Sequence, residues 1–211
     1  MNRQWLQVDM ATLTTTMKEL PDAYQLLGGR GLTSRIIAEQ VPPRCHPLDR
    51  DNVLVIAPGL LAGTKASSCS RLSIGAKSPL TNTIKESNAG GISAGKLARM
   101  GLAAITIEGA APEDSPYLLY ISSNEQKLLQ VPKLRYKGVY EVTKRLLQQY
   151  PNTAVICIGP AGERRMTAAG IATTDIDDVP SRYAGRGGLG AVMGSKCLKA
   201  IIIDDVGSRP I

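Results

Sequence analysis

The chain has 211 residues, with 25 Lys and Arg against 18 Asp and Glu, which gives a formal net charge of +7. Hydrophobic residues make up 43 % and charged residues 20 %, a balance that excludes a disordered chain and supports a packed core. The positive charge favours an anionic ligand, but basic residues are spread along the chain and aromatic ones are scarce, so nucleic acid is not the expected partner.

Apolar patterns predict a strand-rich chain. The first half comprises strands at 5–9 and 13–17, a helical turn at 21–27, a helix at 32–40, strands at 52–57 and 71–76, a helix at 92–100 and a strand at 102–108. The second half comprises a hairpin at 116–122 and 126–131, a helix at 139–149, strands at 153–158 and 166–173, a polar loop at 174–182, a helix at 189–197 and a strand at 198–204. Strands outnumber helices without strict alternation, which indicates α+β rather than a doubly wound sheet.

Two segments, about 50–110 and 150–205, share one order of predicted features. Each has a buried strand, a Pro/Gly turn, a further strand, a glycine pair, a short helix and a last strand. The glycine pairs are Gly90-Gly91 and Gly187-Gly188. This order predicts a duplicated strand/helix unit with pseudo-two-fold symmetry, whose glycine loops face one shared ligand.

The second glycine loop also matches G-x-G-x-x-G, at Gly185, Gly187 and Gly190. A dinucleotide-binding fingerprint needs a strand just before the first glycine, and here a polar loop containing Pro180 precedes it. Two interpretations then stand: phosphate binding at the start of a helix, helped by Arg182 and Arg186, or close packing of backbone between the repeats. Two equivalent loops, each near an arginine, favour the phosphate or cofactor interpretation.

Membrane and metal signals are weak in this chain. The longest apolar run, 53–62, is broken by Pro58-Gly59 and is too short to span a membrane. The start of the chain lacks the apolar region of a secretory signal. The four cysteines are widely separated and form no C-x-x-C, so no local iron–sulfur or zinc site is expected and the cytoplasm is the expected compartment.

Several longer stretches together carry a family resemblance. They are GGRGL (28–32), PLDRDNVLVIAPGLLAGT (47–64), SRLSIGAKSPLT (70–81), SNAGG (87–91), LARMGLAAITIEG (97–109), IGPAGE (158–163) and AGRGGLGAVMGSKCLKAI (184–201). The chain resembles the N-terminal domain of the aldehyde ferredoxin oxidoreductase family, the tungsten-pterin enzymes. The resemblance implies a duplicated α+β domain with two β-sheets and short helices, which forms the base for a tungsten (or molybdenum) bis-pterin cofactor.

The resemblance also implies roles for individual residues. The cofactor-binding set carried over from the family is Arg71, Gly90, Gly91, Arg182, Ala184, Gly185 and Arg186. A magnesium ion that bridges the pterin phosphates would take backbone carbonyls from Asn88 and Tyr183, and oxygen ligands suit Mg²⁺. Tyr183 stands where the family has a small residue. No catalytic residue is expected in this chain.

The family has two further, mostly helical domains, which are not expected within these residues. The resemblance implies that they carry the [4Fe–4S] cluster, and that residues 1–211 form a single cofactor-binding domain. The chain is then either an excised domain or a separately encoded part, and it needs the helical domains or a subunit that carries them.

The implied reaction is oxidation of an aldehyde to a carboxylic acid, with electrons passing to ferredoxin. The chain alone is expected to be inactive, and its exposed cofactor face favours a homodimer. The alternatives are a stand-alone pterin carrier or assembly scaffold, and a generic module that binds phosphate or nucleic acid.

Overall fold

Four apolar runs lie at the centre of the structure, a computed structural model that describes residues 3–208. These runs are β3 (Leu54–Pro58), β6 (Leu102–Glu108), β9 (Ala154–Cys157) and β12 (Leu198–Asp204), and nearly all their residues are buried. Both faces of these strands are covered, which explains why they are continuous apolar runs rather than alternating ones.

The strands form two mixed sheets. The other eight are β1 (Gln4–Asp9), β2 (Thr14–Glu19), β4 (Leu72–Lys77), β5 (Ile84–Ala89), β7 (Tyr117–Ser122), β8 (Gln126–Gln130), β10 (Ile171–Thr173) and β11 (Arg182–Ala184). One sheet has the order β2-β1-β6-β3-β4-β5 and the other β11-β10-β9-β12-β7-β8. The pairs β1·β6 and β7·β12 are parallel, and the remaining neighbours are antiparallel.

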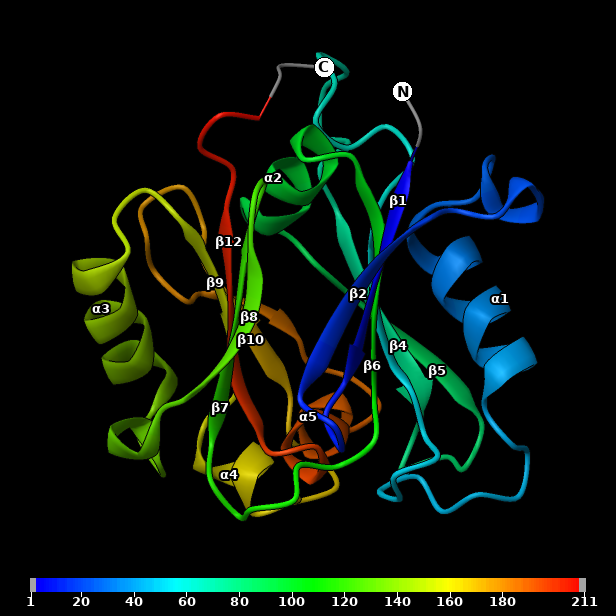
Figure 1. Cartoon of the computed structure of the whole chain (residues 1–211), viewed down its shortest axis with the longest axis vertical. Coiled ribbons are helices and arrows are strands. Elements are labelled where there is room, and N and C mark those ends of the chain that lie inside the picture. The colour runs from blue at the N-terminus through cyan, green and yellow to red at the C-terminus, as the bar shows by residue number, and fades with distance from the viewer. Residues whose placement is uncertain (1–2, 209–211) are drawn as a thin grey trace.

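The sheets stack face to face, and helices cover their outer sides. In Figure 1, α1 (Gly29–Gln40) and α3 (Val139–Gln149) lie on the two flanks. The short helix α2 (Ser93–Arg99) lies at one end of the sandwich, and α4 (Pro160–Glu163) and α5 (Leu189–Ser195) lie at the other. Single 3-10 turns, η1 (Asp22–Tyr24) and η2 (Pro132–Leu134), precede α1 and α3. The main core draws side chains from both sheets, and each flanking helix adds a smaller core of its own.

The two sheets share one strand order. Setting β1–β6 against β7–β12 in sequence order reproduces every neighbour pair and every direction. Each parallel pair also carries one extra residue at the same place, Ala103 in β6 and Lys199 in β12. The match includes β1, β2 and α1, which lie before residue 50, where the sequence pattern places the start of the first repeat.

The predicted α+β class is confirmed, and most predicted elements occur within a few residues of their expected bounds. Helix α1 begins at Gly29, three residues before the predicted start, because the glycines join its first turn. Strand β10 starts at Ile171, since residues 166–169 turn back through a hydrogen bond from the Ala169 N–H to the Met166 carbonyl. The prediction missed β5, β11 and the short helix α4.

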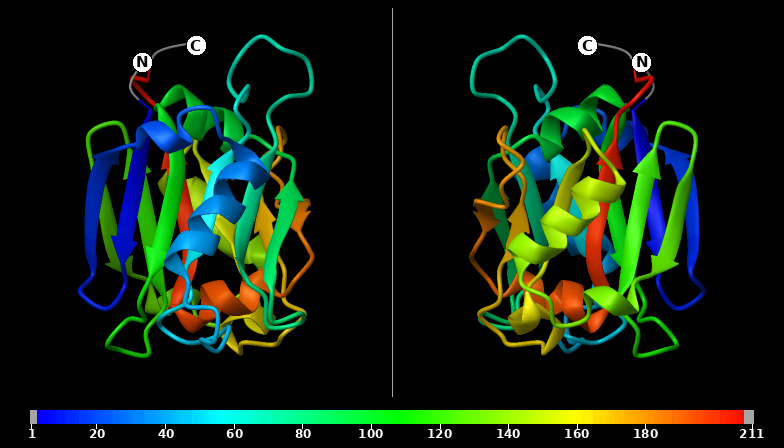
Figure 2. Two further views of the ribbon diagram at one scale, coloured as in Figure 1. Left: turned by 90° about the vertical axis from the view of Figure 1, so that its right-hand side faces the viewer. Right: turned by 90° about the vertical axis from the view of Figure 1, so that its left-hand side faces the viewer.

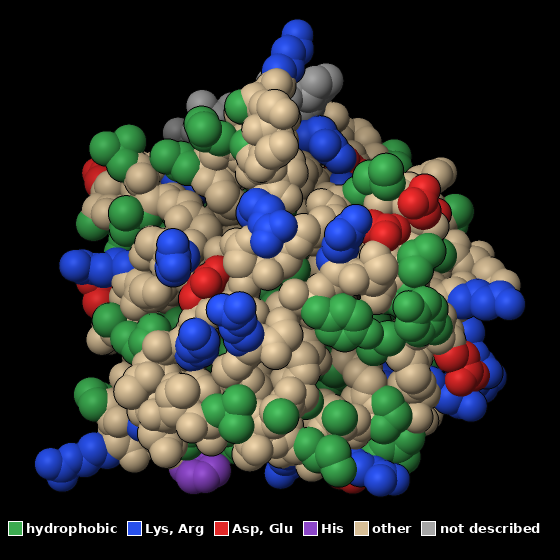
Figure 3. Space-filling view, turned by 180° about the vertical axis from the view of Figure 1, so that it is seen from behind, with side chains coloured by type: hydrophobic (Ala, Val, Ile, Leu, Met, Phe, Trp, Pro, Cys, Tyr) green, Lys and Arg blue, Asp and Glu red, His purple; other side chains and the backbone are tan. Residues whose placement is uncertain are grey.

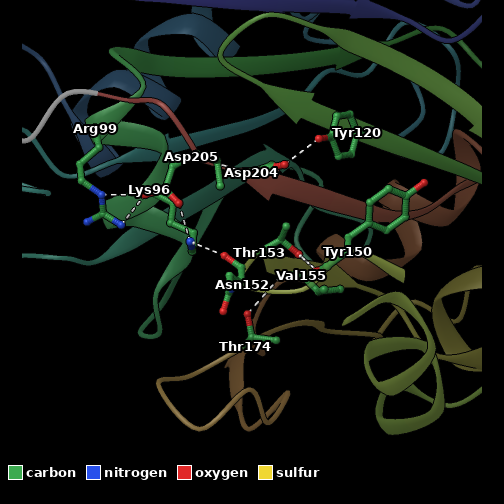
Figure 4. A network of polar contacts seen from close by, with 11 residues as sticks. Lys96, Arg99, Tyr120, Tyr150, Asn152, Thr153, Val155, Thr174, Asp204 and Asp205 are labelled. Carbon is green, nitrogen blue, oxygen red and sulfur yellow. Dashed lines mark hydrogen bonds and ion pairs between the residues drawn. The ribbon is translucent and has the colours of Figure 1, made fainter. Parts of the chain in front are cut away.

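A cluster of polar side chains joins α2 to the second sheet (Figure 4). Asp205, just after β12, accepts a hydrogen bond from Lys96 Nζ at 2.5 Å and one from Arg99 Nε at 2.7 Å. Lys96 Nζ also donates to the Asn152 carbonyl at 2.7 Å. Burial alone would raise the pKa of Asp205, but the hydrogen bonds from Lys96 and Arg99 outweigh it and hold that pKa below 3.8. The first repeat is thereby fixed to the second near the first glycine pair.

Within residues 3–208, no helix is long and apolar enough to cross a bilayer. The four cysteines are all free thiols, with Cys157 buried and the other three half-buried.

Candidate functional site

Two edge strands, one from each sheet, meet on one face of the molecule. Strands β5 and β11 end their respective sheets, and the backbone N–H of Arg186 donates to Ser87 Oγ across the junction at 3.2 Å. Figure 2 shows the orange β11 segment beside the teal strands β4 and β5 in both views. An edge strand leaves part of its backbone outside any ladder, so this junction offers carbonyl and N–H groups to a ligand.

Asn88 and Tyr183, predicted as the two carbonyl ligands of magnesium, occupy equivalent positions on these strands. Asn88 pairs with Ser73 of β4, and Tyr183 pairs with Ala172 of β10, the counterpart of Ser73. The equivalence extends one residue further on each strand, and Gly90 and Gly185 follow at matching places. The pseudo-two-fold relation between the sheets therefore brings the two predicted ligand residues to one junction.

An open hollow of about 710 Å³ lies over the junction. Of the predicted site residues, those that line it are Arg71, Asn88, Tyr183, Gly185 and Arg186. Figure 3 shows this face, where more Lys and Arg than Asp and Glu side chains gather near the centre. The predicted residues come from two parts of the chain, 71–88 and 183–186, and thus share one surface.

The charge of the hollow is strongly positive. Four cationic side chains, Arg30, Arg71, Lys85 and Arg186, face a single carboxylate, Glu86. No ion pair within 4.0 Å joins any of these five to another of residues 3–208. Unpaired cations around a hollow attract an anion and gain most from ligands with several phosphate oxygens.

Arg71 and Arg182 converge on the first glycine loop. Arg71 Nε donates to Asn88 Oδ1, and Asn88 Nδ2 donates to Ser73 Oγ at 3.2 Å. A Cβ atom built on Gly90 would lie 3.5 Å from Arg71 Nη1 and 3.8 Å from Arg182 Cδ. Gly90 thus lies between arginines of the two repeats, although neither it nor Arg182 lines the hollow.

Gly91 and Ala184, also predicted as binding residues, do not line the hollow. Ala184 is fully buried. Gly91 adopts a left-handed φ of +99°, and a Cβ on it would come within 2.2 Å of the Thr174 carbonyl oxygen. These two residues support the junction through backbone packing, as the alternative interpretation of the glycine loops proposes.

At the N-termini of the two helices behind the glycine loops, backbone N–H groups already donate to carbonyls of the protein. The N–H of Ile92, just before α2, donates to the Thr174 carbonyl at 3.1 Å, and the N–H of Gly190 in α5 donates to the Ala169 carbonyl at 2.9 Å. All seven residues of α5 are buried, and a Cβ on Gly194 would lie 1.9 Å from the Gly162 carbonyl oxygen. These two N–H groups are therefore not available to a phosphate, whereas the arginine and lysine side chains of the hollow are.

The sequence interpretation missed Arg30, Ser34, Lys85 and Glu86, which line one side of the hollow. Arg30 belongs to the GGRGL stretch, which carried the family resemblance without an assigned role. Tyr183 lies on the opposite side, where burial raises the pKa of its phenol. No three His, Cys, Asp or Glu residues of the described chain gather as metal ligands.

Comparison with known proteins identifies the family of the chain. The model of "Aldehyde ferredoxin oxidoreductase, N-terminal domain" matches residues 5–205. The chain belongs to this family. The resemblance drawn from the glycine loops and the longer stretches is confirmed.

Curated relatives in this family are much longer than the chain. A tungsten-containing aldehyde ferredoxin oxidoreductase of Pyrococcus furiosus is 34% identical over 99% of this chain and 34% of its own length. The Pyrococcus abyssi protein of that name is 37% identical over 86% of this chain and 29% of its own length. The chain therefore spans about a third of the length of these oxidoreductases.

Other relatives of this domain carry other names. An aliphatic sulfonate oxidoreductase, WOR-like subunit, of Pyrococcus furiosus is 30% identical over 99% of the chain. A solved structure, the active site complex BamBC of benzoyl coenzyme A reductase with 1,5 dienoyl-CoA, superposes with a TM-score of 0.88 at 33% identity, covering 95% of this chain and 30% of that one. The same domain thus occurs in oxidoreductases that are named for different substrates.

Proposed function

We propose that the chain binds a tungsten (or molybdenum) bis-pterin cofactor in the hollow between β5 and β11. The observation that carries this proposal is the equivalence of Asn88 and Tyr183 on two edge strands that meet beneath a basic surface. A cofactor made of two like halves joined through a magnesium ion matches two like strands joined at a pseudo-two-fold axis.

The residues present fit such a cofactor. Arg71 and Arg186 offer guanidinium groups to pterin phosphates, and the hollow has a clear excess of positive charge. The backbone carbonyls of Asn88 and Tyr183 are hard oxygen donors of the kind that Mg²⁺ accepts. When bound, the metal–pterin group would supply the redox chemistry, while these residues bind its phosphates and orient it.

We propose further that residues 1–211 form one cofactor-binding domain made of two repeats. The shared strand order of the two sheets and the matched extra residues in β6 and β12 support this. The four free cysteines support a reducing compartment, and we propose the cytoplasm.

The whole enzyme that this domain serves is proposed to oxidise aldehydes to carboxylic acids and to pass electrons to ferredoxin. The names of the relatives with 33–37% identity support this reaction. The remaining domains, or a subunit carrying them, would supply the [4Fe–4S] cluster, and a homodimer through the exposed face is a further expectation. The similarity to the benzoyl coenzyme A reductase complex favours a second candidate, in which this domain serves an aromatic thioester reductase.

The cofactor proposal is tested by metal and pterin content. The protein is isolated from its native host with any bound partner, and tungsten, molybdenum and oxidised pterin fluorescence are measured. We expect metal and pterin together in the wild type, and about tenfold less in Arg71→Gln combined with Arg186→Gln, a loss of about 1.4 kcal/mol. Lys144→Gln removes one exposed cation from α3 and serves as the control. A native complex that contains neither metal nor pterin contradicts the proposal.

A further inference from the structure

The hollow extends beyond the predicted residues, along the groove between α1 and β5. Arg30 and Ser34 come from the first turns of α1, and Lys85 and Glu86 from β5. Arg30 is exposed, and Lys85 is half-buried with its Cγ 2.4 Å from the place of a Cβ on Gly187. The stem of Lys85 is therefore held against the second glycine loop, and Lys85 lines the hollow together with Arg30 and Ser34.

The second repeat has no such charge at the equivalent positions. Arg30 is the second residue of α1, and the second residue of α3 is Tyr140. Counting back along the chain from the equivalent residues Asn88 and Tyr183, Lys85 and Glu86 correspond to Pro180 and Ser181, which lie just before β11. The surface there is lined mainly by uncharged groups such as Tyr140 and Pro180, and its one cation, Lys144, is matched by one carboxylate, Asp178. The two halves of the site are thus alike in backbone and unlike in charge.

We propose that Arg30 and Lys85 form an additional subsite for a phosphate or diphosphate group, on the first repeat only. This subsite rests on the proposed cofactor function. With it, the first repeat binds phosphate more tightly than the second repeat does. Two cations on a groove wall, without an ion-pair partner among the described residues, bind a dianion better than one cation does.

Glu86 is the one carboxylate among the residues that line the hollow. Its Oε1 atom is sealed from solvent and has no hydrogen-bond partner within the described structure. Because that oxygen is sealed, a ligand in the open hollow does not reach it. The subsite is therefore defined by the Arg30 and Lys85 cations, and inorganic pyrophosphate is a suitable probe for it.

Pyrophosphate binding to the full 211-residue chain tests the subsite without any loaded cofactor. Isothermal titration at low salt is run on the wild type, Arg30→Gln, Lys85→Gln and the charge-matched control Lys144→Gln, whose residue holds the α3 position equivalent to Ser34. We expect the Kd to rise about fivefold in each of the first two variants and to stay unchanged in the control. Thermal unfolding of each variant confirms that the fold is intact.

Parallel titrations of Arg71→Gln and Arg186→Gln separate this inference from the proposed function. If these two weaken binding while Arg30→Gln and Lys85→Gln do not, the additional subsite is refuted and the main site stands. If only Arg30→Gln and Lys85→Gln weaken binding, the subsite stands and the main phosphate site is wrong. A wild-type chain that binds no pyrophosphate at low salt overturns both.

Discussion

Gly91 combines two constraints that only glycine meets. Its φ of +99° lies in the left-handed region, and the Thr174 carbonyl occupies the space where a Cβ would go. The same carbonyl accepts the N–H of Ile92, so the loop of the first repeat lies directly on the backbone of the second. The conformation of the Gly90-Gly91 loop is thus set by the fold and is in place before any ligand binds.

Replacing Gly91 with alanine tests this constraint. We expect Gly91→Ala to lower the free energy of unfolding by about 2–4 kcal/mol, because the methyl group displaces the Thr174 backbone and strains the left-handed turn. The control is Gly101→Ala, which has φ +75° but open space around the Cβ, and it should cost only about 1 kcal/mol. Equal losses in urea unfolding would show that backbone strain alone matters and that the contact does not.

Lys196 is a buried cation with a structural role, and it does not line the hollow. Its ammonium group is fully buried and donates to the carbonyls of Asn52, at 2.5 Å, and Gly109, at 3.2 Å. Burial lowers the pKa of Lys196 to about 8. Asn52 in turn bonds the Pro47 and Lys77 carbonyls. The PLDRDN and GSK parts of the family stretches thus join the two repeats structurally and do not contact the hollow.

At the scale of elements, the strands that carry the site are those the sequence did not reveal. The stretches IKESNA and RYA have too few apolar residues to show alternation, because an edge strand with one face open to a ligand needs little burial. The central strands and α3 were predictable, since their apolar runs and periodicity follow from burial. Arg30 and Lys85 could not be found in this way, since only the packing of α1 against β5 brings them together.

Asp205 contributes two of the side-chain contacts that attach helix α2 to the second repeat. We expect Asp205→Asn to lower the Tm by about 2–6 °C at pH 7, because Lys96 and Arg99 lose a largely buried carboxylate whose side chain is only 13% exposed. Calorimetry is the measurement. Asp114→Asn is the control, since Asp114 pairs with Arg135 in an 87% exposed position and should change the Tm far less.

The Tm difference between wild type and Asp205→Asn should depend on pH in one direction only. The folded pKa of Asp205 lies below its unfolded value of 3.8, so its stabilising contribution is complete above pH 3.8. It declines as the pH falls through the lowered folded value. The Tm difference between wild type and Asp205→Asn should therefore shrink only in strong acid, and a difference already lost at pH 5 would contradict the ion pair as its cause.

At the scale of the molecule, the proposed cofactor lies on an open face and not in an enclosed pocket. The relatives are about three times as long as this chain, and a metal–pterin group held on one open side has no substrate pocket here. We expect the purified 211-residue chain to reduce no viologen dye with aldehydes, whether or not metal is bound. Aldehyde-dependent dye reduction above the rate of the Arg71→Gln variant would refute this.

The pairing of first and last strands in each repeat has a consequence for the way the protein folds. Gln4 pairs with Leu102, and Tyr117 pairs with Leu198, so neither sheet can close before its whole repeat has been synthesised. Such long-range pairing makes folding slow. The first repeat leaves the ribosome complete, with the apolar inner face of its sheet uncovered until the second repeat arrives. We expect this half-finished state to be the point at which the nascent chain needs a chaperone.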